Sequence, residues 1–192
     1  MDLGKTLLVV VGGLALIILI IVLWFIGTYN SLISTDQTVN EKWSQVENQY
    51  QRRYDLIEKL VNVTKGYAAH EKTVFEDVTK ARSQWASAKN LEEKTKAAEE
   101  MNSALSRLIV VVENYPQLKA SDVFMNLQAS IEGTENRVAV ARMDYNTVVK
   151  EYNTKIKVIP TSIVAGMYGF TDKPFFEAEK GAEKSPKADF TN

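Results

Sequence analysis

A continuous uncharged run near the start of the chain restricts its fold more than any other feature. Residues 7–26 carry no charged side chain and are apolar except for Gly12 and Gly13. Twenty residues of α-helix cover about 30 Å, the thickness of the hydrocarbon core of a bilayer. Trp24 and Tyr29 stand at the end of the run, and such aromatic side chains favour the membrane–water interface. The run predicts a single transmembrane helix that binds the lipid bilayer.

Two other interpretations of this run are weaker. A cleaved signal peptide has a shorter apolar region, and no small-x-small cleavage site follows the run. A helix that is apolar on every face also differs from the amphipathic helix of a soluble domain. We therefore expect residues 1–28 to form an uncleaved signal anchor.

The positive charges around the run support opposite topologies, depending on how many residues are counted. Lys5 and the α-amino group precede the run, whereas the first cation after it is Lys42. Counted over the nearest positions, the positive-inside rule places the N-terminus in the cytoplasm and the body outside. A count that extends to Lys59 adds Arg52 and Arg53 and reverses the balance. On the basis of the charges nearest to the run, we expect the body to face outward.

Beyond the run, apolar residues recur at alternating steps of three and four. This spacing lines one face of an α-helix and suits coiled-coil-like packing against other helices. Four stretches show it: Val39 to Thr64, Val74 to Ala88, Met101 to Tyr115, and Phe124 to Ile159, the last with Val148 on its stripe. No run of alternating β-branched residues predicts a strand. The expected fold is all-α, a transmembrane helix followed by an antiparallel four-helix bundle with long helices.

Glycine, proline and serine residues fall where these stretches end. Gly66 can terminate the first helix, and Pro116 forces its preceding residue out of helical geometry. Ser121 can cap the last helix, which Pro160 then stops. The first helix can be continuous with the membrane span, since only the polar patch at residues 34–36 interrupts the pattern.

The end of the chain has a different composition. From Lys173 onward the sequence mixes both signs of charge with Pro174 and Pro186, and it offers few apolar groups to bury. Such a segment does not offset the entropy cost of ordering. We expect a helical domain over residues 29–171 and a mobile charged tail over residues 172–192. The segment between Pro160 and Phe170 is apolar enough to pack on the bundle.

Composition excludes several function classes. The chain has no cysteine and one histidine, which removes disulfide scaffolds, thiol enzymes, lipoproteins and multi-histidine metal sites. Its 23 Lys and Arg balance 24 Asp and Glu, and no basic stripe predicts nucleic-acid binding. We expect no catalytic residue, no cofactor and no metal ion.

A set of charged side chains near the apolar stripes remains to be explained. The candidate interaction or ion-pair positions are Arg53, Asp55, His70, Glu71, Arg82, Glu135 and Arg142. One interpretation is an anion-binding cleft; the other is a set of ion pairs that fixes which helix faces which. His70 and Glu71 lack the partners of a zinc or di-iron motif and fall at a predicted joint, where an exposed or capping role is expected.

The order of motifs resembles the LemA family of bacterial membrane proteins over residues 29–176. The matching residues include Tyr29-Asn30, Arg52-Arg53-Tyr54-Asp55-Leu56-Ile57, Lys65-Gly66-Tyr67-Ala68, His70-Glu71, Tyr115-Pro116, Ala141-Arg142, Tyr145-Asn146 and Tyr152-Asn153. Glu58 stands where family members usually have proline, so the first helix should be straighter here. The resemblance implies one N-terminal span, a helical bundle and no known catalytic residues. It also implies an external N-terminus, opposite to the nearest-charge count, and both topologies stay open.

These features favour a non-enzymatic helical scaffold in the bacterial cytoplasmic (inner) membrane, with its body on the periplasmic side. It would bind protein partners or form a homo-oligomer, and the span has no Gly-x-x-x-Gly pair to drive association. The alternative is a ligand-sensing or hydrolytic helical domain that uses His70, Glu71 and the arginines. That alternative requires these side chains to converge in one pocket.

Overall fold

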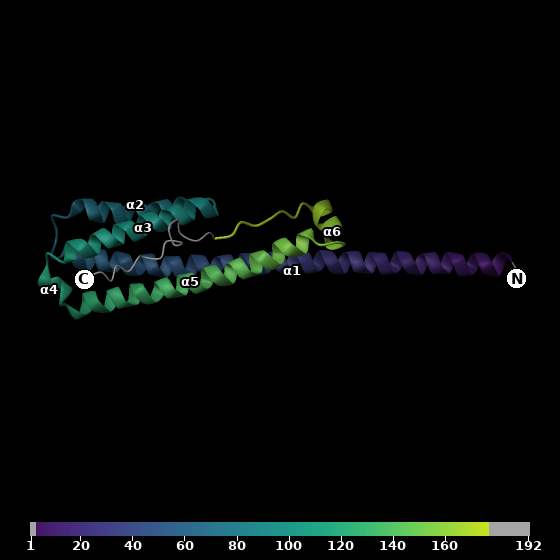
Figure 1. The fold of residues 1–192 in the computed structure, drawn as a ribbon, viewed down its shortest axis with the longest axis horizontal. Helices are drawn as coiled ribbons and strands as arrows, with labels where there is room; N and C mark the ends of the chain where they lie inside the picture. The colour runs from purple at the N-terminus through teal and green to yellow at the C-terminus, as the bar shows by residue number, and fades with distance from the viewer. Residues whose placement is uncertain (1–2, 177–192) are drawn as a thin grey trace, which may run out of the picture. The chain divides into compact units, whose positions relative to one another are not determined.

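The computed structural model describes residues 3–176, and within that range it contains six α-helices and no strand (Figure 1). The helices are α1 (Leu3–Lys65), α2 (Lys72–Ser87), α3 (Leu91–Val112), α4 (Pro116–Lys119), α5 (Asp122–Lys157) and α6 (Thr161–Tyr168). The predicted all-α fold is confirmed. The chain divides into two compact units, unit 1 with Met1–Tyr50 and Arg137–Lys173, and unit 2 with Gln51–Asn136 and Pro174–Asn192.

Helix α1 continues from the apolar run through the polar patch without a break. The hydroxyl of Thr35 donates to the carbonyl of Ser31, and the hydroxyl of Thr38 donates to that of Ser34. These bonds to the carbonyl four residues earlier satisfy the hydroxyls inside the helix, so the patch does not end it. Glu58 also lies within α1, as expected for a chain without a proline there.

The ends of the helices follow local signals. Helix α1 ends at Lys65, immediately before Gly66. The amide of Phe124 donates to the hydroxyl of Ser121 over 3.3 Å, which caps the start of α5. Asn90 caps α3 by accepting from the amide of Glu93 over 2.9 Å, and Glu93 reaches back to the amide of Lys89.

Unit 1 has a core formed by α1, α5 and α6. Its buried apolar side chains are Leu32, Val39, Val46, Tyr50, Val138, Ala141, Tyr145, Val149, Tyr152, Ile156, Val164 and Ala165. Trp43 of α1 meets Tyr145 of α5 edge to face, with ring centroids 5.6 Å apart. The predicted stripes of the first and last stretches therefore supply most of this core.

Unit 2 contains the hairpin of α2 and α3, which lie side by side and are joined by a short turn (Figure 1). The part of α1 after residue 50 packs on this hairpin, because the ring of Tyr54 meets that of Trp85 edge to face at 5.4 Å. Phe75, Val78, Ala81 and Trp85 are the buried residues of α2. Phe75 was absent from the predicted stripe.

Val148 and Ile159 are predicted stripe positions that the structure does not bury. Val148 is half-buried and its neighbour Val149 is fully buried. The buried stripe moves by four residues from Tyr145 to Val149 and then by three residues to Tyr152. Ile159 is 85% exposed, since α5 ends at Lys157 and the stripe ends with it. Phe176 is buried, and residues 177–192 of the predicted tail lie outside the described residues.

Candidate functional site

The apolar run forms an uncovered helix. Within residues 3–176, α1 alone is long and apolar enough to cross a bilayer, and no residue of its most apolar window is buried. Leu8, for example, is 76% exposed. Water solvates such a surface poorly, whereas the hydrocarbon core of a membrane accepts it on every face.

A polar cluster of unit 1 lies just beyond this run. The Lys155 ammonium donates to the hydroxyl of Ser31 over 2.6 Å, to the carbonyl of the same residue over 3.1 Å, and to the hydroxyl of Thr35 over 2.8 Å. These acceptors are all neutral oxygens. The cluster therefore ties α5 to α1 by directional bonds to a charged donor, which are stronger than bonds between neutral groups.

A second polar contact of unit 1 fixes the segment that follows α6. The Asn153 side-chain amide donates to the carbonyl of Lys173, and its oxygen accepts from the amide of the same residue, both over 2.9 Å. The Lys173 ammonium lies 2.9 Å from a carboxylate oxygen of Asp36. It also lies 5.7 Å from the centre of the Tyr152 ring. The segment around Lys173 is thereby held against both α1 and α5.

Two tyrosines of this core have altered acidity. Burial raises the pKa of Tyr145 above its ordinary value. Burial also raises the pKa of Tyr152, and the nearby charges of Asp36 and Asp172 add to the effect because they disfavour a phenolate. Both phenols are therefore held in the protonated form, and neither is prepared to act as a base.

Arg53 is a buried cation of unit 2. Its side chain is 6% exposed, and its Nη2 lies 3.5 Å from a carboxylate oxygen of Glu135, whose side chain is 60% exposed. The Nε atom of Arg53 has no hydrogen-bond partner within the described residues. The ion pair joins α1 to α5 and supports the register interpretation of these charges.

Arg82 takes part in a separate ion-pair group. Its guanidinium lies 3.2 Å from a carboxylate oxygen of Asp55 and also contacts the carboxylate of Glu58. Both acids stand one turn apart on α1, whereas Arg82 is on α2. The sequence prediction included Arg82 and Asp55 but missed Glu58, which only the turn periodicity from Asp55 could have indicated.

The remaining predicted positions are His70, Glu71 and Arg142. His70 is exposed in the turn between α1 and α2, and Glu71 is half-buried at the N-cap of α2 without a capping bond from its side chain. Arg142 is half-buried on the part of α5 that belongs to unit 1. Among the described residues, no group of three or more His, Cys, Asp and Glu could hold a metal ion.

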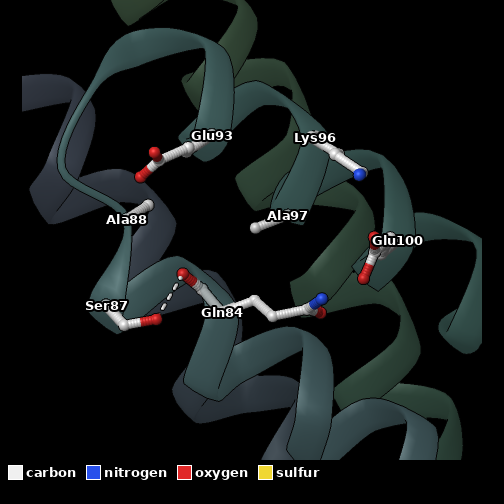
Figure 2. Close-up of a pocket in the computed structure, with 7 residues that line it drawn as sticks. All are labelled: Gln84, Ser87, Ala88, Glu93, Lys96, Ala97 and Glu100. Atoms are coloured by element: carbon white, nitrogen blue, oxygen red, sulfur yellow. Dashed lines mark hydrogen bonds between the residues drawn. The ribbon is translucent and has the colours of Figure 1, made fainter.

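A shallow pocket lies between α2 and α3, and Figure 2 shows the side chains around it. Its volume is about 220 Å³, below the usual range of small-molecule sites. Its lining consists of Gln84, Ser87, Ala88, Glu93, Lys96, Ala97 and Glu100. The dashed line in Figure 2 is the bond from the Ser87 hydroxyl to the Gln84 carbonyl. None of the predicted site residues lines this pocket.

Comparison with known proteins assigns the chain to a family. Residues 42–190 match the model of the LemA family, which is most of the chain. The chain belongs to the LemA family. The resemblance seen in the motifs is therefore confirmed.

Similar proteins include magnetosome proteins. The chain is 28% identical to magnetosome protein MamQ 2 of Paramagnetospirillum magneticum, over 92% of this chain and 75% of that protein. It is 26% identical to magnetosome protein MamQ of Magnetospirillum gryphiswaldense, over 82% of this chain and 67% of that protein. It is 24% identical to protein LemA of Metamycoplasma hominis, over 81% and 72% of the two chains.

Most residues of the charged contacts lie inside the part of the chain that matches the LemA family. Arg53, Arg82 and Glu135 fall in the matched range, as do Asn153 and Lys155. The Ser31 and Thr35 acceptors precede it, and so does the apolar run. The family assignment thus covers the helical body, and the membrane segment rests on its own exposure and composition.

Proposed function

We propose that this LemA-family protein is a single-pass membrane scaffold without enzymatic activity, which binds other proteins or assembles with copies of itself. The observation that carries the proposal is the uncovered apolar helix of residues 7–26, which continues into a helical body. In that body, Arg53 and Arg82 each pair with a carboxylate on another helix. A scaffold needs an anchor and stable surfaces, and these features supply both.

The names of the relatives are compatible with a non-enzymatic role. The similar proteins include magnetosome proteins named MamQ, and neither the MamQ nor the LemA name is that of an enzyme. We infer the same kind of role here, at the bacterial cytoplasmic membrane, with residues 7–26 as a signal anchor. We also infer that the body faces the periplasmic side and that the helical segments of unit 2 form an antiparallel bundle with coiled-coil-like packing.

The alternative of a ligand-sensing or hydrolytic site gains no support from the geometry. That alternative needs His70, Glu71 and the arginines in one pocket. Arg53 and Arg82 instead bind different carboxylates, and His70 is exposed in a turn. We therefore keep the scaffold as the single proposal.

The size and composition of the complex extracted in a mild detergent test this proposal. A scaffold should migrate as a particle larger than one 21.6 kDa chain in its detergent micelle, with either more copies or a stoichiometric partner. Single-cysteine variants at Val123 and Met125, both exposed near the start of α5, then show by disulfide cross-linking in membranes whether that part of the helix lies between copies. A lone monomer at every protein concentration, without cross-links or a stoichiometric partner, would contradict the proposal.

Protease treatment of right-side-out vesicles tests the proposed orientation separately. A body on the periplasmic side is cleaved before the membrane is opened. A body that resists the protease until detergent is added has the opposite orientation.

A further inference from the structure

Helix α6 and the turn before it leave an apolar surface uncovered. Residues 158–171 contain no charged side chain. Ile159 is 85% exposed, Ile163 is 60% exposed and Met167 is 68% exposed. Ile163 and Met167 are four residues apart and therefore share one face of α6. Large aliphatic side chains that gather uncovered on one segment commonly mark a site of contact with a protein or a membrane.

The buried residues of α6 hold this face outward. Val164 and Ala165 are almost fully buried in the core of unit 1, so α6 is packed against the protein along one side. At the end of the helix, Gly169 has a φ of 73°, a conformation that glycine adopts readily, and the chain turns there. The apolar face is thus a fixed part of the fold.

Aromatic contacts place α6 beside the end of the membrane span. The ring of Tyr168 lies 6.0 Å from that of Phe25 and 4.5 Å from that of Tyr29, centre to centre. The ring of Phe170 lies 6.3 Å from that of Tyr29. Phe25 is the next-to-last residue of the uncharged apolar run, so α6 sits at the depth where the span leaves the hydrocarbon core.

The residues that flank α6 fit the same depth. Tyrosine and tryptophan favour the membrane–water interface, and Tyr168, Tyr29 and Trp24 gather in this region of the chain. At the two ends of the uncharged segment, Lys157 and Asp172 form an ion pair at 2.8 Å, with both side chains more than half exposed. Charges at this level can stay among hydrated headgroups while nearby apolar side chains enter the lipid.

We propose that Ile159, Ile163 and Met167 insert into the interfacial layer of the bilayer, and that α6 thereby forms a second lipid contact beside the span. The occupant of the apolar face is lipid because the contacts of Tyr168 with Phe25 and Tyr29 place α6 beside the end of the exposed apolar run. The proposal rests on the proposed membrane anchor of residues 7–26. It adds that the body is held at the membrane surface at two points.

Single-cysteine labelling of the full chain tests this contact. The protein has no cysteine of its own, so I163C and M167C each introduce one unique site for an environment-sensitive fluorophore. The labelled proteins are reconstituted into vesicles of phosphatidylcholine and phosphatidylglycerol. Fluorescence is then measured with lipids brominated near the headgroup and, separately, with aqueous iodide.

The matched control is M143C on α5. Met143 is 62% exposed, similar to Ile163 and Met167, and it precedes Tyr145 by two residues. Tyr145 meets Trp43 of α1, which lies 17 residues, or about 25 Å of helix, beyond Ile26. A label at this position is therefore expected to remain in water.

We expect several-fold stronger quenching by brominated lipid at positions 163 and 167 than at position 143, with the reverse order for iodide. Equal quenching by iodide at all three positions would overturn the proposal. Protection from iodide without quenching by brominated lipid would also overturn it, because a protein surface would then cover α6.

A label in the span separates this proposal from the anchor on which it rests. L16C places the fluorophore in the middle of the apolar run, where lipids brominated deep in the acyl chains should quench it. Quenching at position 16 without quenching at 163 and 167 would refute the second contact alone. An unquenched label at position 16 would refute the anchor itself.

Discussion

The ammonium of Lys155 on α5 lies 2.6 Å from the hydroxyl oxygen of Ser31 on α1, although the two residues are 124 positions apart in the chain. Lys155→Met keeps most of the side-chain volume and removes the charged donor. Because hydrogen bonds from charged groups contribute more than neutral ones, we expect this change to lower the free energy of unfolding by about 1–2 kcal/mol. Chemical denaturation of the detergent-solubilised protein measures the loss.

Lys150→Met is the matched control for this prediction. Lys150 lies on the same helix and is exposed. Its replacement should change stability by less than about 0.5 kcal/mol, as is usual for surface positions. Equal effects of the two substitutions would mean that the contacts of Lys155 with Ser31 and Thr35 contribute no stability.

The Arg53–Glu135 pair should respond differently to the loss of each partner. Glu135→Gln leaves a buried guanidinium without its carboxylate, and we expect a loss of about 1–3 kcal/mol. Arg53→Met replaces the buried charge with an apolar chain of similar length, which is often neutral or stabilising. Urea denaturation of both variants should therefore rank Glu135→Gln as the less stable protein.

Arg107→Met provides the control for an exposed pair. Arg107 lies 3.0 Å from Asp77 and is 55% exposed, so its loss should cost less than about 1 kcal/mol. If Arg53→Met is the most destabilised of the three, the guanidinium stabilises unit 2 directly. If Arg53→Met is stable but abolishes the disulfide cross-linking of the single-cysteine variants between copies, Arg53 belongs to an assembly surface.

The two bonds between Asn153 and Lys173 should protect the Lys173 amide from hydrogen exchange. Asn153→Ala removes both, and at about 1 kcal/mol for each bond we expect exchange to accelerate by roughly thirtyfold. Mass spectrometry of the peptide that covers residues 170–176 measures the rate. Thr154→Ala, at an exposed neighbouring position, should leave it unchanged.

The raised pKa values of Tyr145 and Tyr152 predict a loss of stability in alkaline solution. Above about pH 10 the unfolded chain releases these phenolic protons while the folded protein retains them. The folded state then binds more protons, so stability should fall as pH rises through this range and be unaffected by these groups below it. Melting temperatures between pH 8 and pH 11 should fall less steeply for Y145F/Y152F, whereas identical slopes would contradict the assignment.

Local signals allowed much of the fold to be predicted from the sequence. Gly66, Ser121 and Pro160 mark helix ends because their effects depend on the neighbouring backbone alone. The exposure of the apolar run can likewise be predicted from its own composition. Where two equivalent residues compete, as with Val148 and Val149, the pattern does not choose between them, and the packed partner decides which is buried.

The sequence pattern does not predict contacts between distant segments. In the sequence alone, nothing distinguishes Lys155 from a surface lysine. Its contacts with Ser31 and Thr35 become apparent only in the folded structure. The pairing of Arg82 with Glu58 likewise depends on how α2 lies against α1. The residue type and the position on a stripe indicate candidate residues, but their partners can be identified only from the three-dimensional structure.

The two ends of the uncharged segment 158–171 are already joined within the protein. Asn153 binds the backbone of Lys173, and Lys157 pairs with Asp172, so the segment is a closed loop before it meets any lipid. The conformational entropy lost in closing such a loop is a cost of folding. Contact of α6 with a membrane then requires little further ordering, which makes that surface preorganised for binding.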